Sequence, residues 1–381
     1  MRVLFYYLYG RGGGYLNLMR LLQAMVEVYP DDEFCLVSGQ VSTIDGFKDC
    51  ANVQAAFQTM PLGKEVKRAQ LNTYGLRRIV RSVQPDVIWS INMGPYCDLG
   101  IPHVMTMNNA YQVTSLDDLE AHPSGSLHLK MIRGFFRQSL KHTSTVIVQT
   151  ETIANCLRDV IGYRGRVSVV SKAVEADDDA GFQPLLDSQR KLIDNGLIPN
   201  AITFLYVSDS KPHKNHQVLF DAVGILQSKG VPARLAVTLD RETVIEIGGD
   251  RSEKLIDDGH ILPFGWVDKA QVKPLYDACD ACVMPSRLES QSSAHLEAMK
   301  WQKPQVTIDL PYAREMCRDA AVYADGDSPE QWASQMQELM LSSELRDRLT
   351  QAGLKEIKRY PKSWTEMALT VHGVLEEAVC L

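Results

Sequence analysis

The chain has 381 residues, of which 45% are hydrophobic and 23% are charged, and its formal net charge is −7 at pH 7. This composition is typical of a globular protein of about two domains, and the acidic balance argues against a general nucleic-acid binder. We find no apolar run of about 18 residues that predicts a membrane span, so the sequence predicts a cytoplasmic location or a peripheral one at the inner face of a membrane.

The first apolar segment, 2–9, breaks into glycines and lacks a small-residue cleavage site, so it predicts a strand and not a signal peptide. The eight cysteines lie scattered in apolar segments, as is typical of reduced thiols in a cytoplasm. Cys279 and Cys282 form a C-x-x-C pair, but no second pair or nearby histidine completes a zinc site. We therefore expect these two thiols in the core.

Short apolar strands alternate with helical patterns, which predicts parallel α/β sheets. In the first half we expect strands at 2–9, 33–38, 86–92, 101–107, 145–149 and 167–170, with a helix over 16–29. In the second half we expect strands at 202–208, 234–238, 260–264, 281–285 and 305–309, each followed by a helix. A polar stretch with helical character around 187–195 separates the two halves.

Two tandem doubly wound domains are therefore predicted, over 1–172 and 201–362, with a linker over 173–200 between them. The chain ends in an amphipathic helix within 363–381. Ligands of such sheets bind at the carboxyl ends of the strands, so candidate site residues are sought there.

The segment Glu289 to Glu297 carries two carboxylates with seven residues between them, directly after an expected strand. A strand that runs into a serine-rich turn and then a helix can bind an anion, because N–H groups and the positive end of the helix dipole point at the turn. Ser292 and Ser293 are suitable N-cap residues for that helix. The carboxylates would accept hydrogen bonds from the hydroxyl groups of a phosphate-bearing ligand.

A second candidate segment is Lys211-Pro-His-Lys-Asn215, which follows the strand at 202–208 and opens a helix. Its two lysines would bracket a diphosphate near the other strand ends. The alternative is a solvated, lysine-rich helix start.

Glu289 to Glu297 resembles the E-x7-E element of retaining glycosyltransferases of family 4, which have the GT-B fold of two Rossmann-like domains with a cleft between them. The segment 304–323 is similar to the strand and loop that follow this element, and Lys211 to Asn215 resembles a mannosyltransferase-like branch. Phe264 to Val267 and Leu275 to Asp280 extend the resemblance, which covers about 200–335 and, more faintly, 1–165. In this fold the C-terminal segment, here 363–381, crosses back onto the first domain.

The resemblance implies a role for each motif residue. Lys214 binds the diphosphate of a nucleotide-sugar donor, Glu297 accepts hydrogen bonds from the ribose, and Glu289 faces the donor sugar. The remaining donor-side residues are the backbone of Ser292, Ser293 and Ala294 for the diphosphate, and Phe264, Gly265 and Trp266 along the base. For Trp266 the alternative is a core or lid aromatic.

The chain also departs from the family pattern. Asp209 stands where many members carry an arginine, and Lys211 is the candidate that compensates for it. Serines replace the usual glycine at 292 and apolar residue at 293, which narrows the space near the sugar. Asn108 and Asn109 stand where many members carry a sugar-contacting histidine, and asparagine can bind hydroxyl groups but cannot act as a general base.

The glycine-rich stretch after the first strand fails the dinucleotide-binding pattern G-x-G-x-x-G, because Tyr15 takes the place of the third glycine. Gly13 and Gly14 are instead expected in a loop that lets the backbone approach a ligand on the acceptor side closely. A plain β–α turn is the alternative.

Two basic clusters lie in the first half of the chain. One is the segment 128–142, and the other comprises Lys64, Lys67, Arg68, Arg77, Arg78 and Arg81. Both would fit an anionic membrane surface or a lipid-diphosphate acceptor. For 128–142 the alternative is a core-facing helix with a solvated basic face.

Together these features predict a retaining hexosyltransferase with no obligatory metal and no cofactor. Its donor would be a GDP-, UDP- or dTDP-sugar, with mannose from GDP-mannose first, and its acceptor a glycan or lipid-linked glycan of surface polysaccharide or lipopolysaccharide synthesis. A non-catalytic GT-B module that binds nucleotide or sugar stays open, as does a nicotinamide-dependent oxidoreductase. A metal-dependent reading of the D-x-D at Asp177 to Asp179 is disfavoured by its place in a polar linker.

Overall fold

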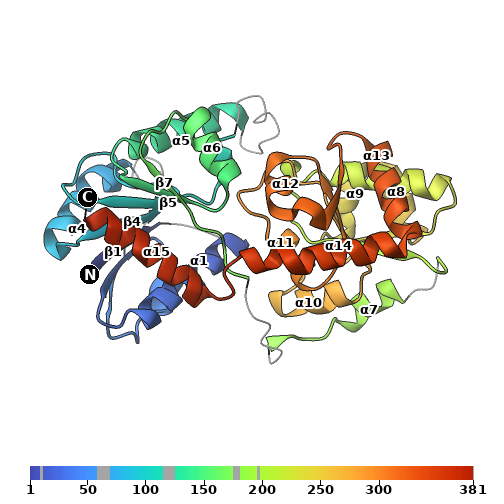
Figure 1. Cartoon of the computed structure of the whole chain (residues 1–381), viewed down its shortest axis with the longest axis horizontal. Coiled ribbons are helices and arrows are strands. Elements are labelled where there is room, and N and C mark those ends of the chain that lie inside the picture. The colour runs from blue at the N-terminus through green and yellow to red at the C-terminus, as the bar shows by residue number, and fades with distance from the viewer. Residues whose placement is uncertain (9–11, 58–68, 115–124, 175–180, 195–197, 381) are drawn as a thin grey trace. The chain divides into compact units, whose positions relative to one another are not determined.

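The computed structural model describes residues 1–8, 12–57, 69–114, 125–174, 181–194 and 198–380. They form two compact units, shown in Figure 1. Unit 1 contains the described residues up to Val174 together with Tyr360 to Cys380, and unit 2 contains Gly181 to Arg359. Asp177 to Asp179, Lys64, Lys67 and Arg68, which the sequence singled out, lie outside the described residues.

Among the described residues, seven parallel strands form the sheet of unit 1 in the order β3-β2-β1-β4-β5-β6-β7. Their bounds are β1 (Arg2–Tyr7), β2 (Glu33–Ser38), β3 (Val53–Phe57), β4 (Val87–Ile91), β5 (His103–Thr106), β6 (Thr145–Val148) and β7 (Arg166–Val169). The strand order reverses between β1 and β4, so the carboxyl ends of these two strands mark the switch point where ligands of such sheets bind.

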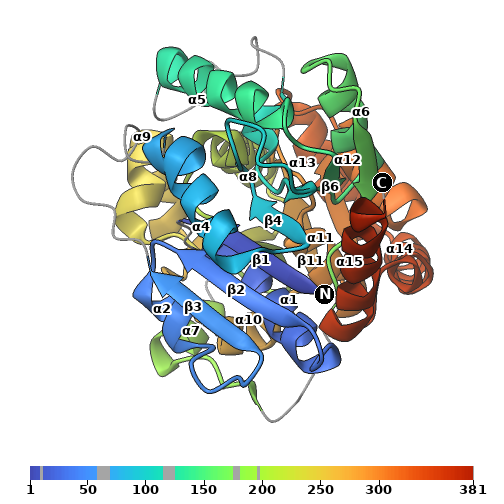
Figure 2. The same cartoon turned by 90° about the vertical axis from the view of Figure 1, so that its left-hand side faces the viewer.

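Helices cover both faces of this sheet, as Figure 2 shows. Helices α1 (Gly12–Val28), α2 (Val41–Asp45) and α15 (Trp364–Val379) lie on one face. The other face carries α4 (Leu76–Val83), preceded by the π-helical turn η1 (Leu71–Gly75), α5 (Gly125–Leu140) and α6 (Glu151–Asp159).

Helix α15 completes unit 1 although unit 2 precedes it in the chain. Met367, Val371 and Leu375 recur at a spacing of four residues and are buried in the same core cluster as Phe5 and Trp89. This apolar stripe is what an amphipathic helix presents to a core. The C-terminal segment is therefore part of the hydrophobic core of the first sheet.

In unit 2, the described residues form a six-stranded parallel sheet in the order β10-β9-β8-β11-β12-β13. The strands are β8 (Ile202–Tyr206), β9 (Ala233–Val237), β10 (Ile261–Pro263), β11 (Ala281–Met284), β12 (Gln305–Ile308) and β13 (Ala321–Ala324). The helices are α7 (Asp187–Ile193), α8 (His216–Ser228), α9 (Arg241–Asp257), α10 (Lys269–Asp277), α11 (Ser293–Lys300), α12 (Pro311–Cys317), α13 (Pro329–Leu341) and α14 (Ser343–Glu356). The order reverses between β8 and β11, which places the switch point of unit 2 at their carboxyl ends.

Helix α1 begins earlier in the chain than the sequence predicts. Helix α1 begins at Gly12 and not at Leu16, so Gly13 and Gly14 lie in its first turn. The prediction of a loop over these two glycines was wrong, because helix termini tolerate glycine where a helix interior does not. A Cβ at Gly14 would meet no atom within 4 Å, so packing within the chain does not require a glycine there.

A buried histidine links strands and helix on the α4–α5 side of the unit 1 sheet. His103 Nε2 lies 2.6 Å from Ser90 Oγ, and its Nδ1 lies 3.0 Å from Thr143 Oγ1. The Thr143 hydroxyl donates to Ser139 O, so it accepts from Nδ1–H, and Nε2 accepts from Ser90. A Cβ at Gly94 would lie 2.3 Å from the imidazole, so only glycine fits beside this ring.

Burial lowers the pKa of His103 to about 3, so the folded unit holds the ring neutral. Below pH 6.5 the unfolded chain binds a proton that the folded chain does not. We therefore expect the free energy of unfolding of unit 1 to fall by about 1.4 kcal/mol per pH unit from this group between about pH 6 and pH 4.

Denaturant unfolding at several pH values checks this prediction, with the His103→Gln variant as the control that lacks the titrating ring. The variant should be less stable at pH 7 and show a shallower pH dependence. Equal slopes for the two proteins would contradict the account.

Candidate functional site

The turn after β8 presents Lys214 at the switch point of unit 2. The chain forms the short 3-10 turn η5 (Pro212–Lys214) before α8. Tyr206 at the end of β8 donates a hydrogen bond from its hydroxyl to Lys214 O at 2.9 Å. Asn215 adopts the left-handed conformation (φ 55°), and its side chain donates to Gly326 O at 2.8 Å. These bonds fix the backbone that carries Lys214.

The turn between β11 and α11 lies against that loop. Arg287 N donates to His213 O at 2.7 Å, which ties the two turns together. Tyr312 of α12 donates its hydroxyl to Ser286 O at 2.5 Å. Segments about 75 residues apart in the chain thus meet at one strand edge, as the doubly wound topology requires.

Lys214 and Glu289 form an ion pair at this edge. Lys214 Nζ lies 2.5 Å from Glu289 Oε1, and the side chains keep only 18% and 16% of their exposure. The ammonium group has three N–H donors, so two of them stay available for another acceptor. Lys214 and Glu289 therefore contact each other. The family resemblance implies that the first binds the diphosphate and that the second faces the sugar.

Two neutral histidines flank this pair. Burial, followed by the charge of Lys214, lowers the pKa of His213 to about 4. Burial also lowers the pKa of His295 to about 4, although the charge of Glu289 opposes this shift. Neither ring adds positive charge near neutral pH. Of the other cations on these two turns, Lys211 pairs with Asp209 and Arg287 pairs with Asp327, whereas Lys214 faces Glu289.

Glu297 lies on α11 and is held by a buried tyrosine. Tyr276 of α10 donates its hydroxyl to Glu297 Oε2 at 3.2 Å and lies 3.3 Å from Ala294 O. Burial and then the charge of Glu297 raise the pKa of Tyr276 well above its ordinary value, so the phenol keeps its proton. Its ring packs edge-on against Trp301, with the two ring centroids 4.7 Å apart.

The helix start between the two glutamates differs from expectation. Ser292 is the N-cap residue of α11, but its side chain makes no capping hydrogen bond, and Ser293 is the first helical residue. Since the first N–H groups of a helix have no partner within it, the N–H groups of this turn depend on other acceptors. Ser292 is buried, and Ser293 is exposed.

Lys211 forms an ion pair with Asp209 and not with a residue of the Lys214–Glu289 pair. Its Nζ lies 2.6 Å from Asp209 Oδ2, and both side chains are about half exposed. Burial alone would raise the pKa of Asp209, but the hydrogen bond and charge of Lys211 hold it below the ordinary value. Lys211 thus neutralises the residue for which it was expected to compensate.

The loop after β10 carries an unusually exposed aromatic side chain. Trp266 is 82% exposed, whereas its neighbour Phe264 is buried, and Gly265 between them has a positive φ of 68°. A core position for Trp266 was therefore a wrong alternative. A lid aromatic and a contact with a base both stay predictions.

In unit 1, the two expected asparagines lie after β5. Asn108 Oδ1 accepts from Asn92 Nδ2 at 2.6 Å, and Asn108 N donates to Asn92 Oδ1 at 2.8 Å. Asn109 accepts from Tyr111 N at 3.2 Å and caps the short turn η2 (Ala110–Gln112). These bonds link the carboxyl ends of β4 and β5, and the side chain of Asn109 is exposed.

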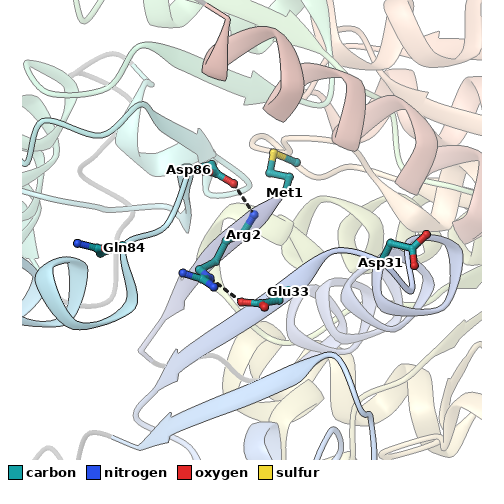
Figure 3. Close-up of a pocket in the computed structure, with 6 residues that line it drawn as sticks. All are labelled: Met1, Arg2, Asp31, Glu33, Gln84 and Asp86. Atoms are coloured by element: carbon teal, nitrogen blue, oxygen red, sulfur yellow. Dashed lines mark hydrogen bonds and ion pairs between the residues drawn. The ribbon is translucent and has the colours of Figure 1, made fainter.

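A polar hollow lies at the opposite, amino-terminal edge of the unit 1 sheet (Figure 3). Its lining residues are Met1, Arg2, Asp31, Glu33, Gln84 and Asp86. Arg2 pairs with Glu33 at 2.5 Å, and its backbone N–H donates to Asp86 at 2.7 Å. These polar residues of the hollow thus already pair within the protein, and the hollow does not lie at the ligand-binding edge of the sheet.

Among the described residues, no cluster of histidine, cysteine, aspartate and glutamate has the arrangement of a metal site. Cys279 and Cys282 are buried in the core of unit 2, where burial raises the pKa of both thiols.

None of the described helices is long and apolar enough to cross a membrane.

The two halves of the chain each match a family model. Residues 37–178 match Glycosyltransferase Family 4, and residues 188–356 match Glycosyl transferases group 1. Together the two matches support a family 4-like group 1 glycosyltransferase. Glu289, Glu297, Lys214 and the loop around Trp266 all lie within the second match. Comparison with curated proteins gives no significant match.

Solved glycosyltransferase structures share the fold. A glycosyltransferase from Rickettsia africae has 15% identity and a TM-score of 0.71 and covers 99% of this chain and 98% of that chain. HepE from Anabaena, solved with UDP, has 14% identity and a TM-score of 0.70 (99% and 100% covered). WaaG, a glycosyltransferase involved in lipopolysaccharide biosynthesis, has 14% identity and a TM-score of 0.69 (98% and 99% covered). The chain therefore has the GT-B fold that the sequence predicted.

Sequence reasoning missed the side chains that hold the motif residues in place. Tyr276 bonds Glu297, and Tyr206 and Tyr312 bond backbone carbonyls of the two turns. His295 bonds Thr307 of β12. Each of the four looks like an ordinary core residue in the sequence. Only His295 could have been singled out from the sequence, because it is a polar residue among the buried apolar residues of α11.

The ion pair of Lys214 and Glu289 should couple the two turns energetically. In a double-mutant cycle with Lys214→Met and Glu289→Gln, we expect a coupling energy of about 1–3 kcal/mol in the free energy of unfolding, because the pair is mostly buried. The exposed pair of Lys211 and Asp209 is the matched control, with less than about 1 kcal/mol expected. Equal coupling in the two cycles would show that the first pair does not hold the turns together.

Proposed function

We propose that this glycosyltransferase moves a hexose from a nucleotide-sugar donor with retention of the anomeric configuration, and that unit 2 binds the donor. The observation that carries the proposal is the meeting of Lys214, Glu289 and the N-terminus of α11 at the switch point of unit 2. HepE from Anabaena, which shares the fold, has been solved with UDP and with UDP-glucose. A nucleotide-sugar is therefore the ligand class that best fits this edge.

Each side chain then has one task. Lys214 binds the diphosphate with the N–H donors that Glu289 leaves available, and the N–H groups of Ser293 and Ala294 bind it from the other side. Glu297, oriented by Tyr276, accepts hydrogen bonds from the ribose. Glu289 orients the sugar through its second oxygen. In addition, the exposed Trp266 and the backbone of Phe264 and Gly265 line the base.

The proposed reaction is a front-side displacement that needs no obligatory metal and no cofactor. The bond from the anomeric carbon to the phosphate oxygen breaks, a bond to the acceptor oxygen forms on the same face, and the departing phosphate takes the acceptor proton. Glu289 is a poor nucleophile while Lys214 neutralises it, which argues against a covalent intermediate on this residue. Lys214 and the start of α11 would stabilise the charge that develops on the leaving diphosphate.

The donor proposed first is GDP-mannose, since Lys211 to Asn215 resembles the mannosyltransferase-like branch, and UDP- and dTDP-sugars follow. The acceptor would be a glycan or lipid-linked glycan of surface polysaccharide synthesis. In unit 1, Asn108, Asn109, Gly13 and Gly14 are the residues proposed on the acceptor and sugar side.

A second candidate function is a non-catalytic module that binds a nucleotide or sugar. Two observations favour it: Asp209 replaces the arginine of many family members, and the side chain of Asn108 is occupied by Asn92. The intact contacts of Lys214, Glu289 and Glu297 favour the enzyme.

Thermal unfolding with UDP, GDP, ADP and dTDP, without added metal, tests donor binding first. A nucleotide at about one hundred times its dissociation constant should stabilise the protein by roughly 2.7 kcal/mol. One nucleotide with a clear shift would select the base and shorten the choice of sugars. If no nucleotide shifts the transition, the donor site is wrongly assigned; binding without transfer to any acceptor would favour the non-catalytic module.

Two variants separate binding from turnover. Glu297→Ala should weaken donor affinity on the order of tenfold to one hundredfold, because it removes hydrogen bonds to a charged acceptor. Lys214→Ala should lower kcat on the order of one hundredfold, because it removes stabilisation of the leaving group. Steady-state kinetics with the matched donor measures both, and Lys229→Ala on a remote surface is the control. Near-normal kinetics for both site variants would refute the assignment.

A further inference from the structure

One face of unit 1 is basic and carries no acidic residue on its two main helices. The stretches 71–83 and 125–142, which form η1 with α4 and α5 with its end, contain no aspartate or glutamate. This is unusual in a chain whose formal net charge is −7. The proposed donor chemistry uses none of these residues.

On α4 the basic side chains point away from the core. Leu76 and Val80 are buried, whereas Arg77, Arg78 and Arg81 are exposed. Tyr74, one turn earlier, is 78% exposed. Within the described part of the chain, none of the three arginines forms an ion pair, and Arg77 makes only a long hydrogen bond (3.5 Å) to Asp98 O.

Helix α5 divides its basic residues between the interior and the surface. Arg133 is buried, and its guanidinium donates to Thr114 O at 2.6 Å and to Tyr111 O at 3.2 Å, so it serves the fold. Lys130, Arg137 and Lys141 stay exposed, and Met131 beside them is 42% exposed. Helix α5 therefore has a core-facing side and a solvated basic side, as the alternative for 128–142 predicted.

The two helices form one continuous surface because the segment after β4 joins them. Tyr96 N donates to Asn72 O of η1 at 2.9 Å, and Gln138 of α5 donates to Tyr96 O at 3.0 Å. The rings of Tyr96 and Phe135 stack with centroids 5.7 Å apart. Both helices lie on the same face of the sheet in Figure 2. We name the exposed side chains Tyr74, Arg77, Arg78, Arg81, Lys130, Met131, Arg137 and Lys141 the α4–α5 face.

We propose that the α4–α5 face docks on the surface of an anionic lipid bilayer. Six cations that pair with no carboxylate of the described residues match a layer of anionic head groups, which attracts each nearby lysine or arginine separately. The exposed Tyr74 and Met131 supply amphipathic and apolar tips of the kind that enter the head-group region. Cations spread over two helices on one face of the sheet fit a plane better than a nucleic-acid groove, and the acidic remainder of the protein would repel a polyanion that wraps it.

Sedimentation with vesicles tests the proposal on the full chain. We expect binding to vesicles of phosphatidylglycerol mixed with phosphatidylcholine, no binding to phosphatidylcholine alone, and a loss of binding as sodium chloride rises. The triple variant Arg77→Gln, Arg78→Gln, Arg81→Gln should lower the partition coefficient on the order of one hundredfold, because each cation near the surface contributes separately. Tyr74→Ala should weaken binding less and should not change its salt dependence.

The matched control removes the same charge elsewhere. Lys229→Gln, Lys254→Gln, Lys355→Gln changes three exposed lysines of unit 2 and should bind vesicles as the unchanged protein does. Equal losses in the two triple variants would overturn the proposal, as would absence of vesicle binding, or binding to a short RNA duplex in preference to the vesicles. Circular dichroism confirms folding of each variant. Nucleotide thermal shifts of the same proteins report on the donor site separately, so either inference can fail without the other.

Discussion

The ion pair between Lys214 and Glu289 is the contact on which the site depends. It joins the turn after β8 to the turn after β11, the two strands between which the sheet order of unit 2 reverses. A doubly wound sheet leaves these two turns side by side but does not fix their side chains. The mostly buried pair does so, because breaking it would leave one charge without a partner in a poorly solvated place.

The groups around the pair add little further charge near neutral pH. His213 and His295 are neutral near neutral pH, since burial lowers the pKa of each to about 4. Lys211 is engaged by Asp209 on the surface. Arg287, in the turn after β11, pairs with Asp327. Lys214 is therefore the cation proposed to meet a diphosphate, and the backbone N–H groups at the start of α11 become correspondingly important for the proposed donor.

The sequence predicted those parts of the fold that local patterns determine. The run Glu33–Ser38 is rich in apolar and β-favouring residues and was placed correctly, whereas Val53–Phe57, with two alanines and a glutamine, has weak strand propensity and was missed. The same limit applies to the site. Motif spacing identified Lys214, Glu289 and Glu297 as candidates, but their pairing, and the support of Glu297 by Tyr276, depends on contacts between distant segments. The start of α1 at Gly12 was missed because glycine patterns favour loops and helix ends alike.

A crystal structure with the nucleoside diphosphate that stabilises the protein most would test the central claim most directly. The account predicts that a phosphate oxygen lies within hydrogen-bonding distance of Lys214 Nζ and of the N–H groups of Ser293 or Ala294, with the ribose at Glu297. A nucleotide bound anywhere else, with Lys214 and Glu289 still paired and without a ligand contact, would contradict it.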